Sequence, residues 1–145
     1  MNGLDKAFAA AGAAAWGGLP FSQLAEDMGT EAIRKAEELC PNPRTVLVAA
    51  FPYYAGERGG NLSLYARGLD YHTVVTRRLN TVCDFLKEKY ENSRFLPAAD
   101  NSPLPERQAA WRCGVGMRGR HGLVILPPYG SYVFLGTILT DAVLE

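Results

Sequence analysis

The sequence predicts an α/β domain in which a mixed sheet is flanked by helices. Three observations support this fold class. A continuous apolar run of strand length occupies residues 44–54, a long stretch with helical periodicity follows at 70–90, and two apolar runs close the chain at 122–128 and 131–139. Strand-like and helical segments that alternate in this way are typical of a sheet covered by helices. At 145 residues, the chain has the size of one domain, 1–145, with a single sizeable core.

The first third of the chain predicts two helices and two strands. Residues 4–12 favour a short helix with Gly12 near its C-terminal end, and residues 13–19 favour a first strand. A second helix is expected over 30–39, with Thr30 as its N-cap and the prolines of CPNP as its stop. After Arg44 and Thr45, the run at 44–54 is uninterrupted by charged residues, as in strands that are buried on both faces.

The rest of the chain predicts two more helices and three strands. An amphipathic helix over 70–90, with Asp70 as a candidate N-cap, is indicated by apolar residues spaced three or four apart. Residues 93–100 are strand-like, and Pro103 and Pro105 then open a helix that continues through 106–112. A glycine-rich loop follows, and the two closing runs are expected to form strands around a PPYGS turn. The periodic positions of the amphipathic helix are Val75, Leu79, Val82, Leu86 and Tyr90.

Composition and charge narrow the function classes. Lys plus Arg and Asp plus Glu number 15 each, so no net charge draws the chain to nucleic acid or to an anionic membrane. The three cysteines, Cys40, Cys83 and Cys113, form no C-x-x-C pair, so this chain alone supplies neither a zinc knuckle nor an iron–sulfur cluster. Asp5 and scattered glycines argue against a signal peptide in the alanine-rich opening, and no stretch has the length of a membrane span. We expect a soluble cytoplasmic protein without membrane association.

Gly114, Gly116 and Gly119 have the Gly-x-Gly-x-x-Gly spacing of a dinucleotide-binding loop. That loop follows a strand and opens a helix, whose N-terminus then faces the phosphates. Here the glycines follow a predicted helix and lead into a predicted strand. The sequence therefore predicts that they do not bind a dinucleotide.

Residues 99–141 resemble the epoxyqueuosine reductase family, the cobalamin-dependent iron–sulfur enzymes of queuosine tRNA maturation. Asp100 and Pro103 match the family's Asp-x-x-Pro segment, and the three glycines match the loop that it writes Gly-Leu-Gly-Trp-Ile-Gly-Lys-Asn. The resemblance is clear over about 44–141 and loose over the first forty residues. Further matches are Glu106 and Arg107 in the short helix, Gly130 and Ser131, FLGTILTD against the family's LGEILTD, and upstream FPYY and YARGLDYH.

Two departures from the family pattern bear on function. The family's Trp, Ile, Lys, Asn and Thr of the loop are replaced here by Met117, Arg118, Arg120, His121 and Gly122, which bears on the substrate more than on the fold. The family also continues into a ferredoxin-like part with eight cysteines for two [4Fe–4S] clusters, which this chain lacks. We expect the chain to be a fragment of a longer protein or a paralogue without its electron supply.

The resemblance implies a nitroreductase-like cobalamin-binding domain whose full activity is reductive deoxygenation of epoxyqueuosine in tRNA. It implies base-off cobalamin as cofactor, tRNA as partner, and electrons from an iron–sulfur domain or protein. Three alternatives stay open. These are a cobalamin-binding or trafficking module without turnover, a redox paralogue acting on a smaller substrate, and a flavin-binding relative.

For the site, the resemblance implies that Asp100 is the general acid that protonates the substrate; the alternative is a cap of the helix near Pro103. Loop glycines would let backbone approach the corrin, or would serve a tight connection that needs positive φ. Arg118 and Arg120 would hold cofactor or tRNA phosphate, or would be solvated. No metal ligand is expected. The predicted cofactor-binding residues are Arg107, Gly116, Met117, Arg118, Gly119, Arg120, Gly130 and Ser131, and the substrate-binding residues are Tyr54, Arg67, Asp70 and His72.

Overall fold

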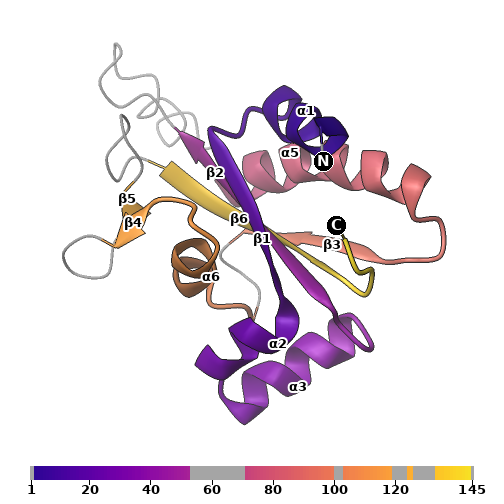
Figure 1. Ribbon diagram of the computed structural model, residues 1–145, viewed down its shortest axis with the longest axis vertical. Helices are drawn as coiled ribbons and strands as arrows, with labels where there is room; N and C mark the ends of the chain where they lie inside the picture. Colours follow the sequence, from indigo (N-terminus) through magenta and orange to yellow (C-terminus); the bar gives the residue numbers. More distant parts are fainter. Residues whose placement is uncertain (1, 53–70, 100–102, 119–123, 126–132, 145) are drawn as a thin grey trace.

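The computed structural model describes residues 2–52, 71–99, 103–118, 124–125 and 133–144. A four-stranded sheet runs through the molecule, with helices packed on both of its faces (Figure 1). In chain order the elements are α1 (Asn2–Ala10), β1 (Ala15–Pro20), α2 (Phe21–Leu24), the 3-10 helix η1 (Ala25–Asp27), α3 (Thr30–Leu39), β2 (Thr45–Pro52), α5 (Tyr71–Lys89), β3 (Phe95–Ala98), α6 (Glu106–Arg112), β4 (Met117–Arg118), β5 (Val124–Ile125) and β6 (Val133–Thr140).

The strand order is β1-β2-β6-β3, so the last strand of the chain lies inside the sheet. β6 pairs with β2 from Pro52↔Val133 to Thr45↔Thr140 and with β3 from Phe95↔Thr140 to Ala98↔Thr137. β2 and β3 are both antiparallel to β6 and therefore run in the same direction, connected by α5. The expected sheet flanked by helices is confirmed, but the pairings between the described strands are all antiparallel rather than mixed. β2, α5 and β3 follow one another in the order of a βαβ unit, but β6 lies between the two strands and pairs antiparallel with both.

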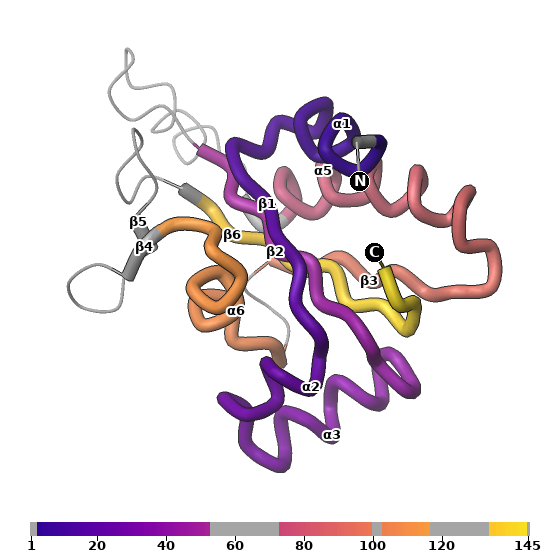
Figure 2. The backbone as a smooth tube through the Cα atoms, in the orientation of Figure 1, coloured from indigo at the N-terminus to yellow at the C-terminus, as the bar shows by residue number. Residues whose placement is uncertain are grey.

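The two closing strands do not pair with each other in the described residues. β5 pairs with β4, through Met117↔Ile125 and Arg118↔Val124, whereas β6 joins the large sheet. The small β4–β5 sheet lies beside α6 and away from α1 and α5 (Figures 1 and 2). The turn expected at 127–131 lies outside the described residues.

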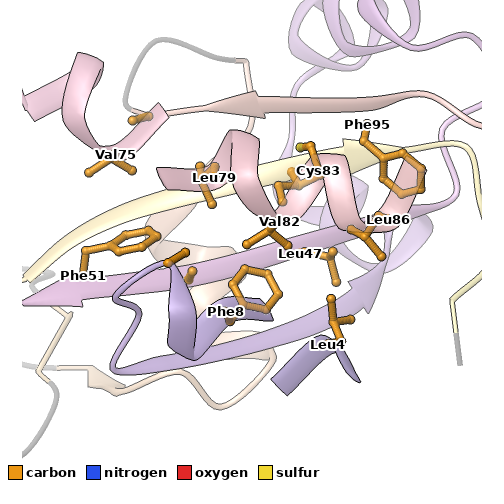
Figure 3. Close-up of a cluster of buried hydrophobic side chains, with 14 of the residues drawn as sticks. Leu4, Phe8, Leu47, Phe51, Val75, Leu79, Val82, Cys83, Leu86 and Phe95 are labelled. Carbon is orange, nitrogen blue, oxygen red and sulfur yellow. The ribbon is translucent and has the colours of Figure 1, made fainter. Parts of the chain in front are cut away.

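One face of the sheet, here called the α5 face, is covered by α1 and α5. Its buried cluster includes Phe8 and Leu47 and the periodic residues of α5, of which Val75, Leu79 and Val82 are fully enclosed (Figure 3). At Gly136 of β6, an added Cβ would lie 2.7 Å from Leu79 Cδ1 and 2.8 Å from Val75 Cγ1. Glycine therefore lets α5 pack directly on the backbone of the central strand.

The opposite face, here called the α6 face, is covered by α6, α2 and α3. Its buried residues include Val48 and Ala50 of β2, Ala36 of α3, and Ala109 and Ala110 of α6. β2 thus contributes side chains to both clusters, as its unbroken apolar run predicts. The alanines allow the short helices to approach the sheet closely.

Helix ends were predicted with mixed success. Gly12 ends α1 with φ +94°, Gly12 N donates to Ala9 O and Ala13 N donates to Phe8 O, which is a Schellman motif. The prediction that Thr30 is an N-cap is wrong. Thr30 is the first residue of α3, and Gly29 occupies the cap position without a side-chain hydrogen bond. Among the described helices, none is both long and apolar enough to cross a membrane.

Candidate cofactor site

The predicted site segments leave the sheet at one end. Pro52 pairs with Val133, so the strand ends that lead to residues 53–70 and 126–132 are neighbours. β1 begins at the same end, because Ala15 pairs with Ala50. The predicted residues Tyr54, Arg67, Asp70, Gly130 and Ser131 lie on these two segments, outside the described residues.

Asp100 also lies outside the described residues, two positions after β3. β3 is antiparallel to β6 and therefore runs toward the end at which β6 begins. α6 begins at Glu106 with Pro105 in the cap position. Both roles considered for Asp100, general acid and helix cap, therefore stay predictions.

The first glycine of the loop has a structural role. Gly114 follows α6 with φ +81°; its N–H donates to Trp111 O, and Val115 N donates to Ala110 O. This is a second Schellman motif, and it requires the left-handed conformation that glycine adopts most easily. The loop then leads into β4, so the order of helix, glycines and strand that excludes a dinucleotide loop is confirmed.

Gly116 is the second glycine, and it too has a positive φ, of +85°. Val115, between the two glycines, is buried against the sheet. Met117 and Arg118 continue as β4, while Gly119 and Arg120 lie outside the described residues. Of the predicted cofactor loop, the structure therefore describes Gly116 and the backbone of β4.

The loop is positioned by a close contact that the sequence did not reveal. A Cβ added to Gly17 of β1 would lie 3.0 Å from both the carbonyl oxygen and Sγ of Cys113, and 3.2 Å from Val115 Cγ2. Glycine at this point of an edge strand therefore admits the turn that follows α6. The sequence predicts only that Gly17 lies in a strand, because a close approach between distant segments has no local signal.

The C-terminal end of α6 is also anchored. Arg112 Nε donates to Asp27 Oδ2 at 2.6 Å, Arg112 Nη2 lies 3.3 Å from Asp27 Oδ1, and the same nitrogen lies 3.4 Å from Glu26 Oε1. The hydrogen bond to Asp27 raises the pKa of Arg112 above its ordinary value. This arginine therefore ties α6 to η1 through a two-point contact with one carboxylate.

Two further predicted residues fall on helices. Arg107 is exposed in the first turn of α6, and His72 is the second residue of α5. The described residues contain no group of three or more His, Cys, Asp or Glu side chains placed to hold a metal ion. The structure thus brings Arg107 and Gly116 onto one α6–β4 unit and places His72 on another element.

The cysteines are placed as buried thiols, with one exception. Cys40 and Cys83 are buried on opposite faces of the sheet, and Cys113 is half-buried. Burial raises the pKa of all three thiols, and that of Cys83 to about 12. Because they lie on two faces, these thiols cannot meet around one cluster without refolding.

Comparison with known proteins decides the family. Residues 34–100 match the family model described as "Epoxyqueuosine reductase QueG, DUF1730". The chain is 33% identical over 114 residues to an epoxyqueuosine reductase of Synechocystis, an alignment that covers 74% of this chain and 39% of the relative. This chain belongs to the epoxyqueuosine reductase family. It is also 36% identical over 89 residues to the epoxyqueuosine reductase of Bacillus subtilis, covering 61% of this chain and 23% of the relative.

Solved epoxyqueuosine reductases share the fold. The Streptococcus thermophilus structure superposes with a TM-score of 0.75 at 23% identity, covering all of this chain and 47% of that chain. An epoxyqueuosine reductase in complex with an epoxyqueuosine-modified tRNA-Tyr stem loop superposes with a TM-score of 0.73 at 22% identity, covering 99% of this chain and 46% of that chain. The chain therefore spans less than half the length of the epoxyqueuosine reductases that it matches.

Two other structures carry information on chemistry in those proteins. One is the Bacillus subtilis epoxyqueuosine reductase with its catalytic aspartate loop swung out of the active site (TM-score 0.68, 22% identity, 99% of this chain, 45% of that chain). The other is a reductive dehalogenase whose structure suggests a mechanism for B12-dependent dehalogenation (TM-score 0.60, 16% identity, 98% of this chain, 19% of that chain). At these identities the likeness establishes the fold. The epoxyqueuosine reductase-type fold predicted from the sequence is confirmed.

Proposed function

We propose that this chain is the N-terminal, cobalamin-binding part of an epoxyqueuosine reductase that acts on tRNA. The proposal is carried by the 33% identity to a named epoxyqueuosine reductase over 74% of the chain. It is supported by the family model, whose match ends at residue 100, and by the fold shared with a B12-linked dehalogenase. Electrons would come from an iron–sulfur domain or protein, because the three thiols of this chain lie on two faces of the sheet.

The described residues fit a broad cofactor that arrives with its metal already coordinated. Within the described residues, a Cβ at Gly114 would meet no atom within 4 Å, so these residues leave this side of the turn after α6 open. Gly116, two residues later, has no side chain to cover its backbone. Arg107 is exposed in the first turn of α6, before the loop. Gly116 and β4 would offer backbone N–H and C=O groups to the amide arms of a corrin, with Arg107 and Arg118 as cationic contacts. Cobalamin, when bound, would supply the electron pair for reduction.

Removal of the epoxide oxygen as water takes two electrons and two protons. In the proposal Asp100 gives the first proton to the epoxide oxygen as its first carbon–oxygen bond breaks. Its carboxylate takes a proton back from solvent and gives it to the resulting hydroxyl group, which leaves as water when the second carbon–oxygen bond breaks. The role is supported by the match of Asp100 and Pro103 to the family's Asp-x-x-Pro segment. A general acid must lie within hydrogen-bonding reach of the atom that it protonates.

A cofactor titration tests the first half of the proposal. The purified chain is titrated with cob(II)alamin and, separately, with FMN, and absorption spectra are recorded. We expect a base-off cobalamin spectrum and no flavin binding. Binding of FMN without cobalamin would show that this chain is instead a flavin-binding member of the same fold.

Asp100→Asn tests the second half. With chemically reduced cobalamin as electron source, single-turnover reduction of an epoxyqueuosine-containing stem loop should slow by about 10²–10⁴-fold, the usual contribution of a general acid. Cobalamin affinity should stay at the wild-type value. Asp84→Asn, on the exposed surface of α5, is the matched control and should react at the wild-type rate. An Asp100→Asn variant as fast as wild type would remove Asp100 from the chemistry.

A further inference from the structure

Three contacts hold the turn after α6, residues 113–116. Arg112, the last residue of the helix, binds Asp27 of η1. The carbonyl oxygen of Cys113 lies 3.0 Å from the place that a Cβ of Gly17 would take, so β1 is in direct contact with the turn. Val115 is 1% exposed and packs in the buried cluster of the α6 face. The turn is therefore fixed from one side by η1, by β1 and by the core.

The partner of Arg112 is itself held in place. Asp27 ends η1, which continues directly from α2, and the α2 residues Phe21 and Leu24 are buried in the same cluster. Arg112 Nε donates to Asp27 Oδ2 at 2.6 Å, and Nη2 donates to Oδ1 at 3.3 Å. A guanidinium that meets one carboxylate at two points has its direction fixed as well as its distance. Arg112 therefore sets the direction in which the chain leaves α6.

This ion pair is better suited to fixing geometry than to stabilising the fold. The side chain of Arg112 is 33% exposed and that of Asp27 is 30% exposed. Ion pairs in contact with solvent contribute little to the free energy of folding. Two residues after Arg112, Gly114 has open space among the described residues where a Cβ would stand, and Gly116 follows with φ +85°. The turn is thus held on one side and open on the other, as a rigid binding loop requires.

We propose that Arg112 is a positioning residue for the cofactor site and that it acts through its pair with Asp27. The pair sets where Gly114 and Gly116 lie, and so where their backbone N–H and C=O groups meet the cofactor, while Arg112 itself does not touch it. The identity of the ligand rests on the proposed function, whereas the position of the turn is measurable without a ligand. The alternative is direct binding of the cofactor by Arg112, in which case Asp27 would compete for the guanidinium.

The ligand-free protein tests the positioning first. Arg112→Lys keeps the cation but loses the fork, and Asp27→Asn keeps the size of the partner but removes its charge. Both variants should melt cooperatively, and both should shift the backbone amide NMR signals of Gly114 and Gly116. The matched control is Arg34→Lys, the same change at an exposed arginine that is paired with two glutamates of α3. It should leave both glycine signals at their wild-type positions.

Titration with cob(II)alamin then tests the link to binding. Arg112→Lys and Asp27→Asn should each weaken binding by about 10-fold or more, as the loss of a residue that supports a binding group typically does. The double variant should bind no more weakly than the weaker single variant, because both changes break the same contact. If Arg112 bound the cofactor directly, Asp27→Asn would release it and leave the affinity unchanged or higher.

The outcomes separate this inference from the proposed function. Glycine signals that move no more than in Arg34→Lys, additive losses in the double variant, or an Asp27→Asn variant with wild-type affinity would each overturn the positioning role. Wild-type protein that binds no cobalamin would overturn the proposed function instead. The glycine signals of Arg112→Lys and Asp27→Asn would then decide by themselves whether the pair positions the turn.

Discussion

On the α5 face, β6 and α5 are in such close contact that an added Cβ at Gly136 would lie within 2.8 Å of two α5 side chains. On the α6 face, the residue next to it, Thr137, lines a cavity of about 230 Å³ and leaves its hydroxyl unsatisfied. Adjacent residues of one strand thus belong to a tightly packed layer and to a loosely packed one. The α5 face has the properties of a core whose role is stability.

The α6 face is built from short helices and turns. It includes the unsatisfied hydroxyl of Thr137, the alanines through which α6 packs on the sheet, and Gly114 and Gly116, which follow α6 with positive φ. Each of these weakens packing or restricts the backbone locally, and such departures gather where a protein binds a ligand. The two faces therefore differ in how closely they are packed against the same sheet.

Leucine truncation on each face should give the largest difference. Leu79→Ala removes a fully buried side chain from the α5 face and should lower the free energy of unfolding by about 2–5 kcal/mol. Leu104→Ala removes a nearly buried leucine that borders the cavity, where fewer neighbours are lost, and should cost clearly less. Urea unfolding of both variants measures the difference. Equal losses would show that the two faces are packed equally well.

Two threonines three residues apart should respond differently to the same change. Thr140→Val leaves Ala142 N without its acceptor and should destabilise the fold by about 1–3 kcal/mol. Thr137→Val replaces an unsatisfied hydroxyl by a methyl group and should be neutral or stabilising by up to about 1 kcal/mol. Thermal melting of the two variants compares them. A destabilising Thr137→Val would mean that this hydroxyl has a partner in the free protein.

The smallest effect concerns pH and the α5 face. Burial raises the pKa of Cys83 from 9.0 to about 12, so the fold favours the neutral thiol. The resulting stability is fully present below pH 9 and is lost as the pH rises toward 12. Unfolding in urea at pH 8 and pH 10.5 should show a larger loss for wild type than for Cys83→Val. Equal losses in the two proteins would place this thiol in contact with solvent.

Much of this fold follows from local patterns. The spacing of Val75, Leu79, Val82 and Leu86 predicted α5, and all four are buried. The unbroken run of β2 predicted burial on both faces. Pro103 and Pro105 predicted the start of α6 to within a few residues, and Gly12 predicted the end of α1. These signals succeed because each is set by neighbours in sequence.

Pairing between distant segments was not predictable in this way. The central place of β6, the pairing of β5 with β4, and the antiparallel sheet all depend on which distant strands meet. The contact of Gly17 with Cys113 and the cavity beneath Ala98 and Thr137 likewise arise from pairs far apart in the chain. Thr30 failed as a cap because Gly29, one residue earlier, adopts the extended conformation that a cap requires, and Thr30 is already part of the helix. At the site, Gly116 and Arg107 are described, while Asp100 stays a prediction.

The central position of β6 has a consequence for how the protein is made. During synthesis β2 and β3 emerge well before residues 133–140, and they cannot pair with each other across the space that β6 fills. Until the last strand arrives, two apolar strands keep open hydrogen-bonding edges, which are sites for association with other chains. Closing the sheet then joins Thr45 to Thr140, a contact across most of the chain, and contacts of such range slow folding. A nascent chain that stalls before Val133 should therefore be a substrate for chaperones, and release of β6 from the ribosome should be the event that ends this dependence.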